Sequence, residues 1–468
     1  MRVTRRDFLL QSGHACFGYA LGAAAFSAGI ARFGLINAFA QGADYRALVC
    51  VFLAGGNDGN NMVIPLDSSG YNAYSTVRST SGLSLPSETL LPITPSSIGS
   101  PFGLHPSLPE LRSLWDDRKL SVVANVGPLA QPLTREQYQG GAPKPYQLFS
   151  HSDQIAQWQS AIADRVSPTG WGGRIADRTP LSTSGFPTLT AISGGLFTRG
   201  QTTSPLSIAA APTGLNQVLV LNGFTDTEAA SRRSSMDFLR TIDTGQTLIG
   251  AASRSVQQAL DISALFTNDV TLNTAFPNTT LGNQLKQVAK VIKFNRESPG
   301  LGLRRQIFFT QVGGSFDTHQ NQLATQASLL TQLSGAVKAF YEATLELGVE
   351  NQVTTFTLSD FGRTFQPAGT GAATVGSDHA WGNHHFVVGG AVRGGDFFGE
   401  IGPNGTVFPV LQLNGPSDTD NRGRWIPTSS VEQYAATLAT WYGVSAADLP
   451  LVFPNIGRFP SMNLGFMV

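Results

Sequence analysis

Short segments made almost wholly of apolar residues recur along the chain, and each is followed by residues typical of turns. This pattern predicts buried strands of a mainly parallel sheet, because a strand that is covered on both faces has no polar side to alternate with. Five such strands are expected: Ala47–Leu53, Leu120–Val126, Gln306–Val312, Val353–Leu358 and Phe386–Val392.

Longer segments between these strands have the pattern of helices. Apolar residues recur every three or four positions from Leu281 to Ile292 and from Leu323 to Leu345, as they do along one face of a helix. Strands that alternate with amphipathic helices predict the α/β class, here a three-layer α/β/α sandwich with a mostly parallel sheet. In such sheets the ligand site lies beyond the carboxyl ends of the strands, so the residues that follow the strands are the first candidates for function.

The first forty residues depart from this pattern. A charged start with the adjacent pair Arg5 and Arg6 leads into a mildly apolar stretch, and Ala38-Phe39-Ala40 fits a cleavage site. A membrane anchor is the alternative, but a spanning helix needs about 20 strongly apolar residues. We therefore expect residues 1–40 to be a twin-arginine export signal. Residues 41–468 would then form a single domain that works in the periplasm or outside the cell.

Charge and cysteine content narrow the partners. Removal of the signal takes four arginines and one aspartate from a chain with 31 basic and 31 acidic residues, which leaves a net charge near −3. Without a basic block we expect no nucleic acid as partner, and without a second long apolar run we expect no membrane span. Cys50 is the only cysteine outside the signal. Stability must therefore come from the core, a bound metal or both.

Aspartate and histidine gather where the predicted strands end. Six histidines lie outside the signal, and four of them fall within residues 319–385. Each alone is explained as well by an ordinary turn or surface position, but together they are what a divalent metal site requires. Neutral imidazole supplies nitrogen ligands, and carboxylates offset the charge of the ion. The candidate ligands are Asp58, Asp317, His319, Asp360 and His379.

Short motifs at the same places resemble the bacterial domain-of-unknown-function family 1501, which looks like a remote branch of the alkaline phosphatase and sulfatase superfamily. The resemblance implies an alkaline phosphatase-like fold. It extends from about residue 45 to residue 400 and rests on these motifs: Gly55-Gly56-Asn57-Asp58-Gly59, Leu104-His105-Pro106, Gly170-Trp171-Gly172-Gly173-Arg174, Phe316-Asp317-Thr318-His319, Ser359-Asp360-Phe361-Gly362-Arg363, and Asp378-His379 followed by Gly389-Gly390.

The resemblance also implies roles for the candidate ligands. Asp58 resembles the first metal aspartate of the superfamily, and Asp317 with His319 resembles its Asp/His pair. Asp360 resembles the aspartate of an Asp-His pair, and His379 resembles the late histidine. Phe361 stands where the partner histidine of Asp360 would be. This departure from a two-zinc site leaves one metal, or a harder ion held mainly by oxygen. Zinc, manganese, magnesium and calcium all stay open.

A nucleophile is expected where a helix begins after the second strand. Ser150 or Ser152 would lie at the start of the helical-looking segment Ile155–Asp164, where backbone N–H groups favour an anion. The alternative is an ordinary helix cap. The Ser-His pair common in the family favours Ser150. His151 is then a candidate general acid, substrate contact or further ligand. Arg363 is a candidate clamp for an anionic oxygen, or a member of an ordinary ion pair.

The resemblance therefore implies an exported, metal-dependent hydrolase of a small anionic substrate, a phosphate or sulfate ester. The alternative is a non-catalytic exported binding or scaffold protein that keeps the fold and a relic metal site. Genes of family 1501 often neighbour those of another family of unknown function, number 1800. A protein of that family is therefore the expected partner.

Replacement of both arginines, Arg5→Lys with Arg6→Lys, should stop export. The twin-arginine pathway reads the arginine pair itself, whereas insertion driven by hydrophobicity and charge would tolerate lysine. Cell fractionation of both forms measures this, and an unchanged amount of periplasmic protein in the lysine variant would contradict the export prediction.

Overall fold

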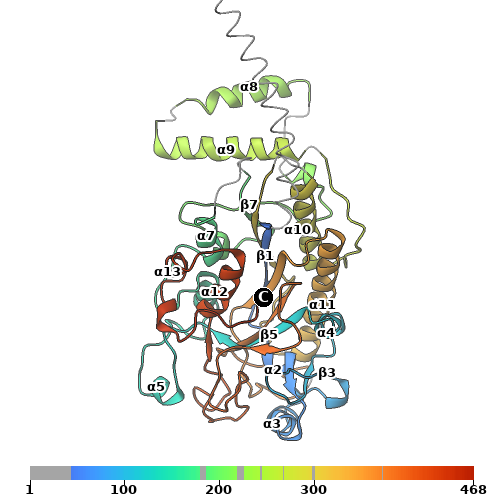
Figure 1. The fold of residues 1–468 in the computed structure, drawn as a ribbon, viewed down its shortest axis with the longest axis vertical. Coiled ribbons are helices and arrows are strands. Elements are labelled where there is room, and N and C mark those ends of the chain that lie inside the picture. The colour runs from blue at the N-terminus through green and yellow to red at the C-terminus, as the bar shows by residue number, and fades with distance from the viewer. Residues whose placement is uncertain are drawn as a thin grey trace, which may run out of the picture.

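A computed structural model describes residues 44–179, 186–218, 226–242, 245–266, 268–297, 301–371 and 373–468. The export signal expected over residues 1–40 lies outside these ranges and stays a prediction. Within the described ranges one large sheet of nine strands runs through the protein, with helices on both sides (Figure 1). Its strands are β1 (Arg46–Leu53), β5 (Leu120–Gly127), β6 (Leu189–Ala191), β7 (Leu206–Ser207), β8 (Arg305–Gln311), β9 (Val353–Ser359), β10 (Asn383–Val388), β11 (Phe397–Phe398) and β12 (Ser429–Ser430).

All five strands expected from the sequence are present. Four of them agree with the expected bounds to within a residue or two. The fifth was expected over Phe386–Val392, but β10 begins at Asn383 and ends at Val388, before the pair Gly389-Gly390. Apolar residues continue beyond the strand, and this continuation shifted the prediction.

The direction of β10 decides which loops meet. β1 pairs in parallel with β8 on one side and with β9 on the other. β10 runs antiparallel to both β9 and β5. The carboxyl ends of β1, β8 and β9 therefore share one edge of the sheet with the amino end of β10. Segments that follow three strands and precede a fourth are brought together at this edge.

Helices cover both faces of the sheet. Alternate residues of β1 show this, because they pack in two different hydrophobic clusters, one on each face. Val49 and Val51 pack in a cluster with α10 (Thr280–Glu297) and α11 (Gln322–Glu346), the two helices that the sequence predicted. Leu48 and Cys50 pack in a second cluster with α6 (His151–Ser160), α7 (Trp171–Ala176) and α12 (Val431–Tyr442). The predicted three-layer α/β/α sandwich with a mostly parallel sheet is confirmed.

The remaining elements are short or peripheral. A small three-stranded sheet is formed by β2 (Val63–Pro65), β3 (Leu91–Ile93) and β4 (Phe102–Leu104). The other helices are α2 (Gly59–Met62), α3 (Ser68–Arg78), α4 (Pro109–Asp116), α5 (Arg135–Gln139), α8 (Ala229–Leu239), α9 (Thr247–Leu265) and α13 (Leu449–Val452), with 3₁₀ turns at Ser87–Thr89, Leu196–Thr198, Leu215–Gln217 and Ile456–Arg458. Helices α8 and α9 lie apart from the sheet at one end (Figure 1). In the part of the chain described, none of the helices has the length and apolar character to cross a bilayer.

Glu432, at the start of α12, is a carboxyl group buried in the core. Its side chain is 2% exposed, and the backbone N–H of Asn455 donates to Oε2 at 3.0 Å. Its Oε1 has no hydrogen-bond partner among the described residues. Burial raises the pKa of Glu432 to about 8, although the Asn455 contacts and the charge of Arg174 act in the other direction.

Glu432→Gln should stabilise the protein at pH 8 and leave its stability unchanged at pH 4. The native pKa lies above the ordinary value of 4.5, so between these pH values the unfolded chain loses a proton that the native protein keeps. Wild-type stability therefore falls as pH rises through this window, whereas glutamine keeps the acceptor without a proton to lose. Thermal melts of both proteins at the two pH values measure the difference, expected to be several degrees at pH 8. Equal melting points at pH 8 would contradict a raised pKa of the buried Glu432.

Candidate metal centre

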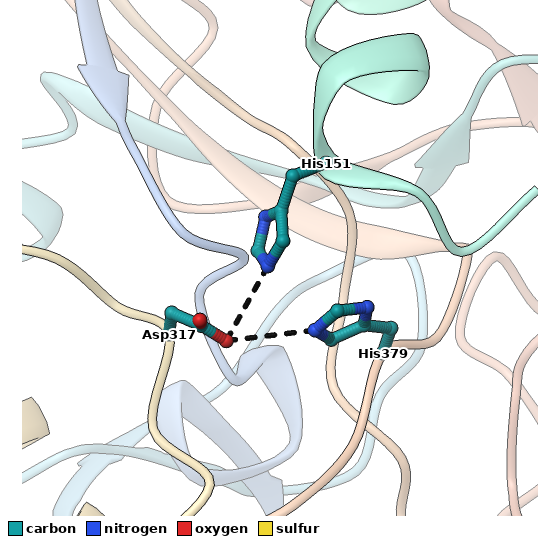
Figure 2. A group of neighbouring side chains, drawn as sticks. All are labelled: His151, Asp317 and His379. Atoms are coloured by element: carbon teal, nitrogen blue, oxygen red, sulfur yellow. Dashed lines mark ion pairs between the residues drawn. The ribbon is translucent and has the colours of Figure 1, made fainter.

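Four side chains meet at the edge of the sheet where β1, β8 and β9 end. Asp317 and His319 lie in the segment after β8, His151 is the first residue of α6, and His379 lies before β10. We call these four residues the His–Asp cluster. One ligand atom from each of His151, Asp317 and His379 lies within 4.8 Å of the other two. Figure 2 shows both imidazole rings with a nitrogen facing the carboxylate of Asp317.

The distances within the cluster are those of ligands around one ion. Asp317 Oδ1 lies 3.4 Å from Nε2 of His151, 3.5 Å from Nε2 of His379 and 3.0 Å from Nε2 of His319. The Nε2 atoms of His319 and His379 are 3.0 Å apart. Ligands bound tetrahedrally to zinc at about 2.0–2.1 Å lie about 3.4 Å from one another. His151, Asp317 and His379 form the compact part of the cluster, and His319 extends it on one side.

An oxygen atom of the protein lies within hydrogen-bond distance of Nδ1 of each histidine in the cluster. Nδ1 of His379 lies 2.7 Å from the carbonyl oxygen of Phe149, which can only accept, so this nitrogen carries the proton and Nε2 presents a lone pair. Nδ1 of His151 lies 2.7 Å from Asp360 Oδ2, and Nδ1 of His319 lies 3.3 Å from Asp378 Oδ1. Histidines that bind metals are oriented in this way.

The donor set fits a metal ion by a second criterion. Nε2 of His151 is buried and has no hydrogen-bond partner among the described residues. A buried polar atom without a partner is costly, and a bound cation would satisfy its lone pair. The cluster remains open on one side, since the side chains of Asp317 and His319 are 38% and 46% exposed.

Asp360 contacts Nδ1 of His151 and is not one of the ligand atoms grouped within 4.8 Å among the described residues. Its side chain is 1% exposed, Oδ1 accepts from the backbone N–H of Gly55 at 3.0 Å, and Oδ2 is the partner of His151. Both oxygens are therefore occupied by protein groups. The sequence selected this aspartate as a ligand, whereas its contacts in the structure are those of a residue that orients one.

Both carboxylate oxygens of Asp58 accept hydrogen bonds from protein groups, chiefly from an arginine. Arg78, at the end of α3, donates to both of its oxygens, at 2.6 and 3.2 Å, and both side chains are buried. The backbone N–H of Asn60 donates to Oδ1 at 3.1 Å and Gln322 Nε2 donates to Oδ2 at 2.5 Å. Asp58 is not in the group of ligand atoms that lie within 4.8 Å of one another in the described residues, and its role as a ligand stays a prediction.

Arg363 makes hydrogen bonds to the segments at the ends of three other strands. It follows β9, and its Nε donates to the carbonyl of Gly56 at 2.9 Å, in the loop after β1. Nη1 donates to the carbonyl of Ser377 at 2.9 Å, before β10, and Nη2 donates to Asp317 after β8. The side chain is fully buried. Of the two roles that the sequence left open for Arg363, the ion pair is the one these contacts give.

The hydroxyl of Ser150 has its hydrogen-bond partners outside the His–Asp cluster. Ser150 is the N-cap residue of α6, as the sequence suggested, but its side chain makes no capping hydrogen bond. It donates to Asp153 Oδ2 at 2.6 Å and lies 3.2 Å from the hydroxyl of Ser152. Neither serine makes a hydrogen bond to a member of the cluster within the described residues.

Charge and burial shift the pKa values of three cluster residues. The pKa of His151 is raised, chiefly by its hydrogen bond to Asp360, whereas burial lowers the pKa of His379. Burial alone would raise the pKa of Asp317, but the hydrogen bond and charge of Arg363 outweigh it and the pKa is lowered. Asp317 is thus kept as an anion, the form that binds a cation.

Two of the histidines that drew attention to this region belong to the core. His384 and His385 lie in β10, and burial lowers the pKa of each to about 3. The functional contacts that sequence reasoning missed are those of Phe149, Asp378 and Arg78. Asp378 stands beside His379 and was visible as part of its motif, whereas the carbonyl of Phe149 left no signal in the sequence.

A family model described as "Protein of unknown function (DUF1501)" matches residues 45–408. Among curated proteins, none matches this sequence. In solved structures, Ps i-CgsB in complex with k-i-k-neocarrahexaose is similar over 88% of this chain and 76% of its own, with 10% identity and a TM-score of 0.34. A putative sulfatase from Bacteroides thetaiotaomicron VPI-5482 is similar over 88% and 74%, with 10% identity and a TM-score of 0.30. A mutant TAB5 alkaline phosphatase with Mg bound is similar over 74% and 90%, with 11% identity and a TM-score of 0.26.

Asp58→Asn should destabilise the protein without changing its metal content. The substitution leaves the buried guanidinium of Arg78 without its counter-charge, and loss of one partner of a buried ion pair costs about 3–5 kcal/mol. Denaturant unfolding measures the loss, and elemental analysis of the folded fraction should give the wild-type metal content. A variant with wild-type stability that holds no metal would restore Asp58 as a ligand.

Proposed function

Because the chain belongs to the DUF1501 family, which is described as being of unknown function, we propose its function from the chemistry of the His–Asp cluster. We infer a metal-dependent hydrolase of phosphate or sulfate esters. One observation carries the proposal: three imidazole Nε2 atoms face the same carboxylate oxygen, and each ring is held from behind by an oxygen acceptor.

Zinc is the ion that this donor set favours among the four that the sequence left open. Imidazole nitrogen suits zinc, whereas magnesium and calcium prefer sites made of oxygen. A structural zinc site is closed by its four protein ligands, and a catalytic one keeps a position for substrate or water. The exposed fractions of His151, His319 and His379, 31%, 46% and 24%, support a site that substrate can reach.

The roles proposed for the chain's own residues follow from their contacts. Asp317 supplies negative charge to the bound ion, and Arg363 fixes the direction of that carboxylate. Asp360 and Asp378 hold the rings of His151 and His319. When bound, a zinc ion supplies Lewis-acid chemistry, which polarises an ester oxygen and lowers the pKa of an attacking hydroxyl group.

Ser150 remains the hydroxyl group of the chain that we propose to test as the nucleophile. It directly precedes the ligand candidate His151, and its side chain is not used to cap α6. Its hydrogen bond to Asp153 would have to be exchanged for one to the substrate site. Water is the alternative nucleophile, and Ser150→Ala distinguishes the two, because only a serine nucleophile would make this variant inactive.

A non-catalytic binding or scaffold protein is the second candidate. The ring of Phe361 favours it, because the ring centroid lies 4.7 Å from those of both His151 and His379. An apolar residue that contacts two of the cluster histidines therefore stands at the sequence position where the family resemblance implies another ligand. The proposal also includes export by the twin-arginine pathway and a partner protein from family 1800. Both of these parts rest on the sequence alone.

Metal removal should lower both stability and activity at pH 7.5. A ligand that binds only the native state stabilises it by about 2.7 kcal/mol at a hundredfold excess over its Kd, which is several degrees in melting temperature. Chelator should therefore lower the melting point of the wild type and abolish turnover of an aryl phosphate or aryl sulfate. His379→Ala should match the chelated wild type and be insensitive to chelator.

The effect of chelator should vanish at pH 5. A metal-bound histidine must be neutral, and the hydrogen bond to Asp360 raises the pKa of His151, so protons compete with the ion for this histidine more strongly than for an ordinary one. Metal without turnover would favour the binding protein. Wild type that contains no metal and melts identically with and without chelator at pH 7.5 would contradict both candidates.

A further inference from the structure

The segment that leads into His151 has a backbone conformation that its sequence does not favour. Gln147 and Phe149 have φ angles of +47° and +70°. L-residues with bulky side chains rarely adopt this left-handed region, because Cβ approaches the following carbonyl oxygen. Two such residues within three positions persist only where surrounding contacts hold them. The contacts of Phe149 therefore show what the conformation serves.

Phe149 is fixed through its backbone and through its ring. Its N–H donates to Oε1 of the buried Gln154 at 2.6 Å, and its carbonyl oxygen accepts from Nδ1 of His379 at 2.7 Å. The guanidinium of Arg424 lies over its ring, 4.4 Å from the centroid. The left-handed conformation thus presents a carbonyl group to a member of the His–Asp cluster.

Arg424 also contacts the residue on the other side of that hydrogen bond. Its Nε donates to the backbone carbonyl of His379 at 3.0 Å. Its Nη1 pairs with Asp420 at 3.0 Å, and its own backbone N–H donates to the buried Asp418 at 3.0 Å. One planar side chain therefore touches both Phe149 and His379, while its own loop holds it in place.

We propose that Phe149 and Arg424 are positioning residues that act as a unit on His379. The contact between the Phe149 ring and the Arg424 guanidinium fixes the position of the Phe149 carbonyl group. This carbonyl in turn sets the tautomer and the ring orientation of His379. This inference rests on the proposed function, since it requires that His379 binds the metal. It assigns to a backbone carbonyl the role that Asp360 has for His151 and Asp378 has for His319.

A purely structural role of Arg424 is the alternative, and Arg135 provides the matched control. Arg135 donates to the carbonyl groups of Gly415 and Asp420, in the same loop that carries Arg424. If Arg424 acts only by holding this loop, Arg135→Met should weaken metal binding as much as Arg424→Met. If Arg424 acts on the contact between Phe149 and His379, only Arg424→Met should weaken it.

A double-mutant cycle on metal affinity tests the proposal. Zinc affinity is measured by competition with a chromophoric chelator for the wild type, Phe149→Leu, Arg424→Met, the double variant and Arg135→Met. Loss of a group that orients a metal ligand weakens binding by about 10–100-fold, so each single variant should bind about tenfold more weakly. The double variant should lose no more than either single one, because both changes remove the same contact. Arg135→Met should bind as the wild type does.

The outcomes separate this proposal from the proposed function. Wild type that binds no zinc removes the metal centre and the positioning role together. Wild type that binds zinc, with single variants within twofold of it, overturns the positioning role and leaves the metal centre. Multiplied losses in the double variant, or an equal loss in Arg135→Met, overturn joint action of the two residues on His379. Melting of the metal-free variants shows that each is folded when its affinity is measured.

Discussion

The buried guanidinium of Arg363 links the segments at the ends of four strands by hydrogen bonds. Arg363 donates to carbonyl groups in the loop after β1 and in the segment before β10, and to the carboxylate of Asp317 after β8. A buried cation must find such partners, since an unpaired charge in the core is far costlier than an unpaired amide. The same guanidinium thus contacts all of these segments, and it donates to the oxygen of Asp317 that faces three histidines. Gly55 is required here as well, because with φ at +103° a Cβ would lie 2.4 Å from the backbone nitrogen of Asp317.

Burial separates two kinds of carboxylate that look alike in the sequence. Asp58 and Asp360 are each 1% exposed, and both oxygens of each accept hydrogen bonds from protein groups. Asp317 is 38% exposed and meets one arginine and three imidazoles through a single oxygen. A carboxylate saturated with donors serves the fold, whereas one that faces deprotonated nitrogen atoms on an open side can bind a cation. This difference underlies the choice of ligands in the proposed function.

The scaffold could be predicted from the sequence more directly than the contacts of the candidate ligands. Runs of apolar residues identify strands that are covered on both faces, and this is why β1, β5, β8 and β9 were placed correctly. Clustering of Asp317, His319 and His379 at strand ends follows from the same topology. The partner of Asp58, in contrast, is an arginine twenty residues further on in α3, and nothing in a helical pattern indicates that its side chain turns inward.

The rest of the site could not be predicted because it depends on side-chain directions and on backbone groups. Asp360 and Asp317 both follow strands, and only the direction of each side chain decides which lies behind a histidine and which lies in front. The carbonyl of Phe149 holds His379 through a left-handed residue that no turn motif announces. His151 was proposed from a helix start as an acid, a substrate contact or a ligand, and its position opposite Asp317 favours the last of these.

The central claim is that the His–Asp cluster binds one divalent ion through Asp317 and the imidazole nitrogens. Diffraction from crystals of zinc-loaded protein, collected on both sides of the zinc absorption edge, tests it most directly. We expect one anomalous peak about 2.0–2.2 Å from Asp317 Oδ1 and from the Nε2 atoms of His151 and His379. A peak at Asp58, or zinc-loaded crystals with no peak at the cluster, would contradict it.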